Sequence, residues 1–172
     1  MLNCLPRKRS WRTLSAAMYI SAISVNESQT DGNGNLTFVD KPTPGITQAD
    51  QWRVTSSFDA ADSDVTSNWA RNNTDFALIG SGMTESSGIF TFPQTGIYHV
   101  VMSGRIFSNS DTYTSIYMSV TTDNSSYTEI ARNGDGDAGA GGSANCGSFI
   151  DVTDTTQVKV KFGTDSFASG SQ

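Results

Sequence analysis

Apolar residues occupy alternate positions in several short runs from residue 50 onward. The longest run extends from Tyr113 to Thr122, where Ile116, Met118 and Val120 alternate with serine, threonine and tyrosine. Because successive side chains of a strand point to opposite faces, this alternation predicts a strand with one buried face. The same alternation directs a further set of residues toward one core: Trp52, Val54, Phe58, Phe90, Phe92, Tyr98, Val100, Met102, Ile106, Val158, Val160 and Phe162.

These runs predict an all-β domain. Roughly seven short strands, with turn residues about every eight to twelve positions, are typical of a β-sandwich or jelly roll. Charged residues make up only 16% of the chain, and no helical period of useful length competes with the alternation. The abundant Ser, Thr, Gly, Asn and Asp disfavour helices and favour strands joined by turns.

A leader of different character precedes this domain. Residues 1–13 form a basic head, and residues 14–25 form a serine-interrupted apolar run whose alternation predicts a strand. Paired with Asn35–Val39 across the turn signal that begins at Asp31, this strand would form a hairpin. A secretory signal is the alternative interpretation. A docking role is assigned to the four cations of the head, Arg7, Lys8, Arg9 and Arg12.

Two prolines and a glycine mark the boundary between leader and domain. Pro42, Pro44 and Gly45 form a compact breaker, so we divide the chain into a leader of residues 1–45 and a domain of residues 46–172. No stretch approaches the roughly 18 to 20 uninterrupted apolar residues that a bilayer span requires. We therefore expect no membrane span.

Charge and the metal-binding residue types narrow the function further. Eleven basic residues against seventeen acidic residues give a net charge of −6, which argues against binding to nucleic acid. One histidine and two cysteines exclude the commoner zinc frameworks and a disulfide lattice. His99, the only histidine, lies in the middle of a predicted strand whose alternation turns it away from the core, which disfavours a role as the base beside a Ser or Cys nucleophile. We expect no enzymatic activity.

The glycine-rich stretch from Asn133 to Gly142 is expected to form a solvated loop. Its carboxylates Asp135 and Asp137 are weak candidates for Ca²⁺, because carboxylate oxygens are the ligands that this ion prefers. The loop lacks the lysine of a phosphate-binding loop. We expect no cofactor, with Ca²⁺ as the alternative.

One segment resembles the signature of the C1q/TNF-like jelly-roll family. An aromatic strand ends in a turn at Pro93, and a Gly-x-Tyr motif follows, with an apolar residue two positions later. A long strand, an acidic glycine-rich loop and an alternating valine strand then follow in the family's order. The resemblance covers about residues 50 to 165. The motif residues are Gly88, Phe90, Phe92, Gly96, Tyr98 and Val100.

This resemblance implies a trimer, and it leaves open which strand completes the jelly roll. Domains of the family pack three jelly rolls around an axis, and Tyr113 and Tyr117, expected to be exposed, are candidate contacts with the other subunits or a partner. The family closes its fold with an aromatic-rich final strand beside the first strand, and Phe167 to Gln172 do not match it. The chain is then a fragment, or the hairpin of Tyr19 to Val39 or a neighbouring subunit fills the place.

Two functions are favoured on these grounds, and a carbohydrate-active enzyme on the same scaffold is a remote third alternative, because a fold does not fix a function. The first is a non-enzymatic, trimeric virion protein, such as a phage tail-fibre tip or a capsid decoration protein, whose partners are other virion proteins or a host surface protein or glycan. The second is a secreted C1q-like recognition or signalling module that binds carbohydrate or protein. The low charge, the high Ser, Thr and Gly content and the absence of a collagen-like repeat favour the virion protein. Sequons such as Asn124 would count for the secreted module.

Overall fold

The described residues of the computed structural model form twelve β-strands and no helix, so the all-β prediction is confirmed. Every strand pair is antiparallel. No helix long and apolar enough to cross a membrane occurs in this part of the chain. The structure describes residues 29–30, 36–37, 45–57, 63–76, 78–107, 113–135 and 141–167.

The largest sheet has six strands, and the last strand of the chain lies in its middle. β12 pairs along its whole length with β9 on one side, and with β7 and β4 on the other. Strand β10 extends the sheet beyond β9, and β6 extends it beyond β7. The six strands are β4 (Ser63–Asp64), β6 (Thr84–Ser86), β7 (Ile89–Thr91), β9 (Tyr113–Thr121), β10 (Thr128–Asp135) and β12 (Lys159–Phe167).

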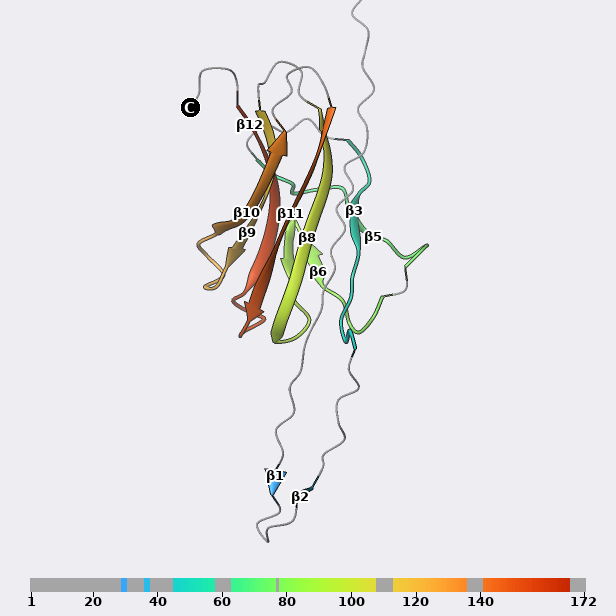
Figure 1. The fold of residues 1–172 in the computed structure, drawn as a ribbon, viewed down its shortest axis with the longest axis vertical. Helices are drawn as coiled ribbons and strands as arrows, with labels where there is room; N and C mark the ends of the chain where they lie inside the picture. The colour runs from blue at the N-terminus through green and yellow to red at the C-terminus, as the bar shows by residue number, and fades with distance from the viewer. Residues whose placement is uncertain are drawn as a thin grey trace, which may run out of the picture.

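A long antiparallel pair of strands forms the second layer. Strands β8 (Gly96–Phe107) and β11 (Gly141–Val152) pair over their full length, and they contact β9 and β10 (Figure 1). A separate short pair joins β3 (Trp52–Val54) to β5 (Trp69–Arg71). The layers enclose one core, so the fold is consistent with a β-sandwich. The jelly-roll order of the strands stays a prediction.

The core confirms the alternation found in the sequence. Tyr98, Val100 and Met102 of β8 lie buried in one cluster with Ile116 and Met118 of β9. Within the same cluster, aromatic rings pack edge to face, which is a favourable arrangement because of the ring quadrupole. The other buried members of the predicted core are Trp52, Val54, Phe90, Phe92, Val158, Val160 and Phe162. The side chains of Phe58 and Ile106 lie outside the described residues.

Strand β9 departs from the predicted single buried face. Ile116 and Met118 are buried as expected, whereas Val120 is only partly buried. Ser115 and Ser119, on the opposite face, are also buried, at 0% and 5% exposure. The reason is that long side chains of the neighbouring strands cover this face, as described below for the candidate site.

The motif that carries the family resemblance is structural. Tyr98 is fully buried, and its hydroxyl donates a hydrogen bond to the carbonyl oxygen of Gln94 at 2.8 Å. Gly88 has a φ of 80°, and a Cβ there would lie 2.3 Å from the carbonyl oxygen of Val65. Only glycine fits this turn without strain. Gly96 also has a positive φ, 146°, at the start of β8.

A buried ion pair holds β3 and β5 on the core. Asp50 is 1% exposed, and its carboxylate accepts hydrogen bonds from Arg71 Nε at 2.9 Å and from Trp52 Nε1 at 2.9 Å. The backbone N–H of Met83 donates to the same carboxylate at 2.8 Å. The Arg71 guanidinium also lies 4.6 Å from the centroid of the Trp52 ring. We call these four residues the buried clamp.

One expectation about a loop needs correction. The glycine-rich stretch is not entirely a loop, because Asn133–Asp135 belong to β10 and Gly141 and Gly142 to β11.

In the leader, β2 (Leu36–Thr37) pairs with β1 (Gln29–Thr30) across the predicted turn. The alternating run at residues 17–25 lies outside the described residues, so its pairing stays a prediction.

The missing closing strand stays a prediction. Among the described residues, β8 has β11 as its partner on one side only, and β3 pairs with β5 alone. The place expected for a closing strand is beside the first strand of the domain. Residues 168–172 lie outside the described residues.

Candidate functional site

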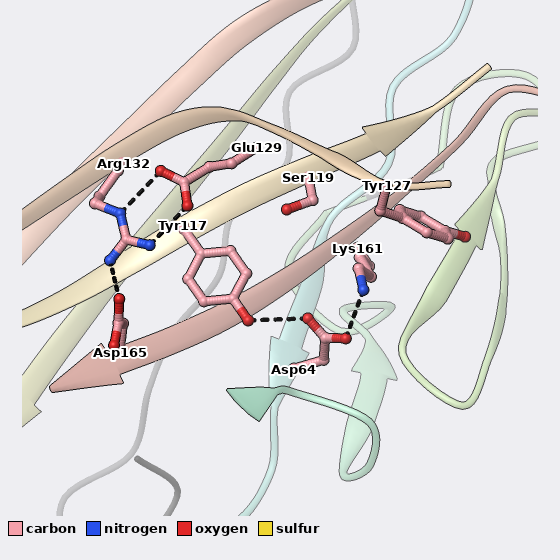
Figure 2. Close-up of a pocket in the computed structure, with 8 residues that line it drawn as sticks. All are labelled: Asp64, Tyr117, Ser119, Tyr127, Glu129, Arg132, Lys161 and Asp165. Atoms are coloured by element: carbon pink, nitrogen blue, oxygen red, sulfur yellow. Dashed lines mark hydrogen bonds and ion pairs between the residues drawn. The ribbon is translucent and has the colours of Figure 1, made fainter. Parts of the chain in front are cut away.

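A shallow polar hollow of about 370 Å³ lies on the outer face of the six-stranded sheet. Its wall and floor come from four strands and from the residue before β10, so distant parts of the sequence meet there (Figure 2). The lining residues combine both signs of charge with two aromatic rings. They are Asp64, Tyr117, Ser119, Tyr127, Glu129, Arg132, Lys161 and Asp165.

The first row of the hollow runs across four strands. Arg132 of β10 pairs with Tyr117 of β9, which pairs with Gly163 of β12, which pairs with Asp64 of β4. A Cβ at Gly163 would lie 2.1 Å from Cζ of Tyr117, so the ring lies directly over this glycine. This position lets the Tyr117 hydroxyl donate to Asp64 Oδ1 at 3.0 Å (Figure 2).

A β-bulge places two residues of β10 on the same face. Glu129 pairs with Ser119, and Arg132 pairs with Tyr117. Glu129 and Arg132 are three positions apart, and in a regular strand their side chains would therefore point to opposite faces. The register shift between Glu129 and Ala131 adds one residue, Ile130, and restores both side chains to the outer face. Arg132 then donates twice to the Glu129 carboxylate, at 2.8 and 2.6 Å.

Arg132 is the most connected side chain of the hollow. Besides Glu129, its guanidinium donates to Ser115 Oγ at 2.7 Å and to the Asp165 carboxylate. It also lies 5.2 Å from the centroid of the Tyr117 ring. The planar guanidinium with its five N–H donors suits this combination of a bidentate carboxylate and further acceptors.

Lys161 closes the opposite side of the hollow. Its ammonium donates to Asp64 Oδ2 at 2.7 Å and lies 4.4 Å from the centroid of the Tyr127 ring. In Figure 2, Ser119 lies between the Tyr117 and Glu129 side and the Tyr127 and Lys161 side. Ser119 pairs with both Glu129 and Lys161, so a small side chain flanked by long ones leaves the hollow above it.

Burial and neighbouring charged groups shift the pKa values of three side chains in the hollow. Burial raises the pKa of Tyr117, and the hydrogen bond to Asp64 and the charges of Asp64 and Asp165 raise it further, against an opposing effect of Arg132. Burial and then the Asp64 charge raise the pKa of Tyr127. The hydrogen bond from Arg132 lowers the pKa of Glu129. These shifts move all three groups away from neutral pH, where a general acid or base works best.

A second surface of different character lies on the outer face of β8 and β11. Phe149 is 71% exposed and Ile97 is 42% exposed. His99 pairs with Phe149 across the two strands, and their rings stack with centroids 4.6 Å apart. His99 thus faces away from the core, as predicted. We call Ile97, His99 and Phe149 the apolar patch.

Tyr113 and Tyr117, the predicted contact residues, are less exposed than the sequence pattern indicated. Tyr117 lines the hollow and Tyr113 does not, and both are half-buried rather than exposed. The cause is glycine on the neighbouring strands: Tyr117 lies over Gly163, and a Cβ at Gly134 would lie 2.7 Å from Cζ of Tyr113. Each ring packs flat on the sheet because no side chain stands beneath it.

The other predicted site residues divide into two groups. The family motif residues, from Gly88 to Val100, form the core and its turns and line neither surface. The docking head lies outside the described residues, as do Asp137 and the side chain of Asp135. Within the described ranges, no group of three or more His, Cys, Asp or Glu side chains is placed to hold a metal ion.

Sequence reasoning missed most of the hollow. Asp64, Arg132, Lys161 and Asp165 come from three strands, and their meeting depends on register, which the sequence pattern does not give. One signal was available. The outward positions of the alternating strand from Val158 to Phe162 are lysines, which marks a polar outer face.

Comparison with models of known protein families finds no match to the chain, and comparison with curated proteins finds no significant match. The resemblance to C1q/TNF-like domains therefore stays a prediction from the residues alone.

Proposed function

We propose that this chain is a non-enzymatic structural and binding module that assembles as a homotrimer, as the resemblance to C1q/TNF-like jelly rolls implies. The observation that carries the proposal is the apolar patch. Phe149 is 71% exposed on a sheet whose other face is buried in the core. Ile97 is also exposed, at 42%, and exposed apolar side chains close together on a regular sheet surface are typical of an interface between proteins.

The patch is suited to contact between rigid surfaces. Ile97, His99 and Phe149 lie on two strands that are paired over twelve residues each, so their positions are fixed by backbone hydrogen bonds. Burial of this apolar surface contributes roughly 25 cal/mol for each Å² removed from water. A flat aromatic ring such as that of Phe149 adds contact area with little loss of side-chain freedom.

A virion is the setting that we propose, in a phage tail-fibre tip or a capsid decoration protein. The composition supports it: few charges, two cysteines, and abundant serine, threonine and glycine. The partners are then further copies of the chain, other virion proteins and a host surface protein or glycan.

The alternative is a secreted recognition module, and one observation favours it. Asn124 begins an Asn-Ser-Ser sequon and lies exposed in the turn between β9 and β10, with a φ of 54°. An exposed turn is accessible to glycosylation in a secreting eukaryotic cell. Expression in such cells, followed by measurement of the mass before and after glycosidase treatment, distinguishes the two settings.

Light scattering of the full chain tests the assembly. We expect three times the chain mass for the natural sequence and the mass of one chain for Phe149→Lys, because a charge in the patch opposes its burial. Ile46→Ser is the matched control, since Ile46 is 54% exposed but lies outside the patch, and it should leave the trimer intact. A monomeric natural chain would contradict the trimer, and a trimeric Phe149→Lys variant would exclude the patch as its interface.

A further inference from the structure

The hollow on the six-stranded sheet offers hydrogen-bonding groups of both kinds in fixed positions. Asp64 and Glu129 present carboxylate oxygens, and Lys161 and Arg132 present N–H donors, within one open space of about 370 Å³. Their side chains are 22% to 39% exposed, so they are both held by partners and open to solvent. This volume is within the usual range for a site that accepts a small molecule.

We propose that this hollow binds a neutral carbohydrate, one or two sugar rings in size. A sugar hydroxyl donates one hydrogen bond and accepts others, so a single ligand class can satisfy the carboxylates and the cations together. The rings of Tyr117 and Tyr127 supply apolar surface for the C–H groups of a sugar. The inference rests on the proposed function only in that the module binds rather than catalyses.

The charge of the hollow disfavours ionic ligands. Three carboxylates, Asp64, Glu129 and Asp165, against the cations Arg132 and Lys161 leave a net charge of −1. An anionic sugar would meet this net negative charge. A cationic ligand would have to displace Arg132 or Lys161 from carboxylates that already hold them through short hydrogen bonds. A neutral polyol adds hydrogen bonds without breaking any ion pair.

The groups are also preorganised, which lowers the entropic cost of binding. Arg132 is held by Glu129, Asp165 and Ser115, so its side chain is already ordered before a ligand arrives. Lys161 is held between Asp64 and the Tyr127 ring. Long charged side chains that are not already ordered would lose conformational freedom on binding, which weakens the affinity.

The test is an NMR titration of the full chain with lactose, maltose and cellobiose, and with glucuronic acid as the anionic comparison. We expect at least one disaccharide to shift the amide signals around Ser119 with a dissociation constant in the millimolar range, and glucuronic acid to bind at least about ten-fold more weakly. The absence of shifts with all three disaccharides up to about 10 mM would overturn the proposal. So would equal or tighter binding of glucuronic acid.

Two variants locate the binding. Tyr127→Ala should weaken it at least about ten-fold, since it removes one wall of the hollow. Lys161→Met, which keeps the length of the side chain and removes its donors, should also weaken it. Tyr113→Ala is the matched control, because Tyr113 lies on β9 but does not line the hollow. Unchanged affinity in both Tyr127→Ala and Lys161→Met would show that the sugar does not bind in the hollow. These measurements can be interpreted whether or not the chain assembles as a trimer.

Discussion

The buried clamp and the hollow each contain an arginine paired with a carboxylate, but the two regions differ in their access to solvent. In the clamp, Asp50 is 1% exposed and Arg71, Trp52 and Met83 satisfy its oxygens inside the protein. In the hollow, the carboxylates of Glu129 and Asp64 are 39% and 32% exposed. The two arginines do not differ in this way, since Arg71 is 32% exposed and Arg132 is 30% exposed. A buried carboxylate must be fully paired, so the clamp leaves no capacity for a ligand. Solvent access to the carboxylates, rather than the number of contacts, therefore distinguishes the hollow from the structural ion pair.

The strongest test of this comparison breaks the clamp. Asp50→Ala leaves Arg71 and the N–H groups of Trp52 and Met83 without their acceptor, so we expect a loss of about 3 kcal/mol in the free energy of unfolding. Chemical denaturation monitored by tryptophan fluorescence measures it. Asp75→Ala, at an exposed carboxylate, serves as the control and should change the free energy by less than about 0.5 kcal/mol. Equal effects of the two variants would refute a structural role for the clamp.

A second test concerns the glycine beneath Tyr117. Gly163→Ala should cost about 2 kcal/mol, because the new Cβ would lie 2.1 Å from Cζ of Tyr117 and the ring must move. The double variant with Tyr117→Ala removes the clash. Its free energy of unfolding should exceed the value expected from adding the two single effects. Strict additivity in the denaturation series would show that the ring does not depend on this glycine.

The smallest expected effect belongs to the exposed ion pair. The hydrogen bond from Arg132 lowers the pKa of Glu129 in the folded protein below its ordinary value of 4.5. The ionised carboxylate therefore stabilises the fold above pH 4.5, and this stabilisation is lost as the pH falls through the pKa of Glu129 in the folded protein. Glu129→Gln should therefore cost less than about 1 kcal/mol at pH 7. Thermal unfolding of both proteins from pH 7 to pH 3 should show the gap closing in acid. A gap that is constant with pH would contradict this assignment.

The sandwich could be predicted from the sequence because alternating runs such as those of β8 and β12 direct apolar side chains to one face. The alternation identified Tyr98, Val100 and Met102 on β8 and Val160 and Phe162 on β12, and all five are buried. Short strands such as β4 and β6 carried too few residues to show a period. The double burial of β9 escaped prediction because polar side chains of neighbouring strands, rather than apolar residues, cover its outer face.

The hollow could not be predicted because it depends on which strands are neighbours. Tyr117 was singled out for its expected exposure, yet its ring lies half-buried over Gly163, a residue 46 positions away in the sequence (163 − 117). Asp64 and Lys161 are farther apart still. The apolar patch was also missed: Phe149 stands out only once its pairing with His99 on the outer face is known.

The bulge in β10 shows how little genetic change the hollow requires. Ile130 is the one extra residue between Glu129 and Arg132, and both Ile130 and Ala131 pack against the core. The insertion or loss of a single codon at this point therefore decides whether Glu129 and Arg132 share a face. Such a change would separate Glu129 from Arg132 without altering any residue that lines the hollow.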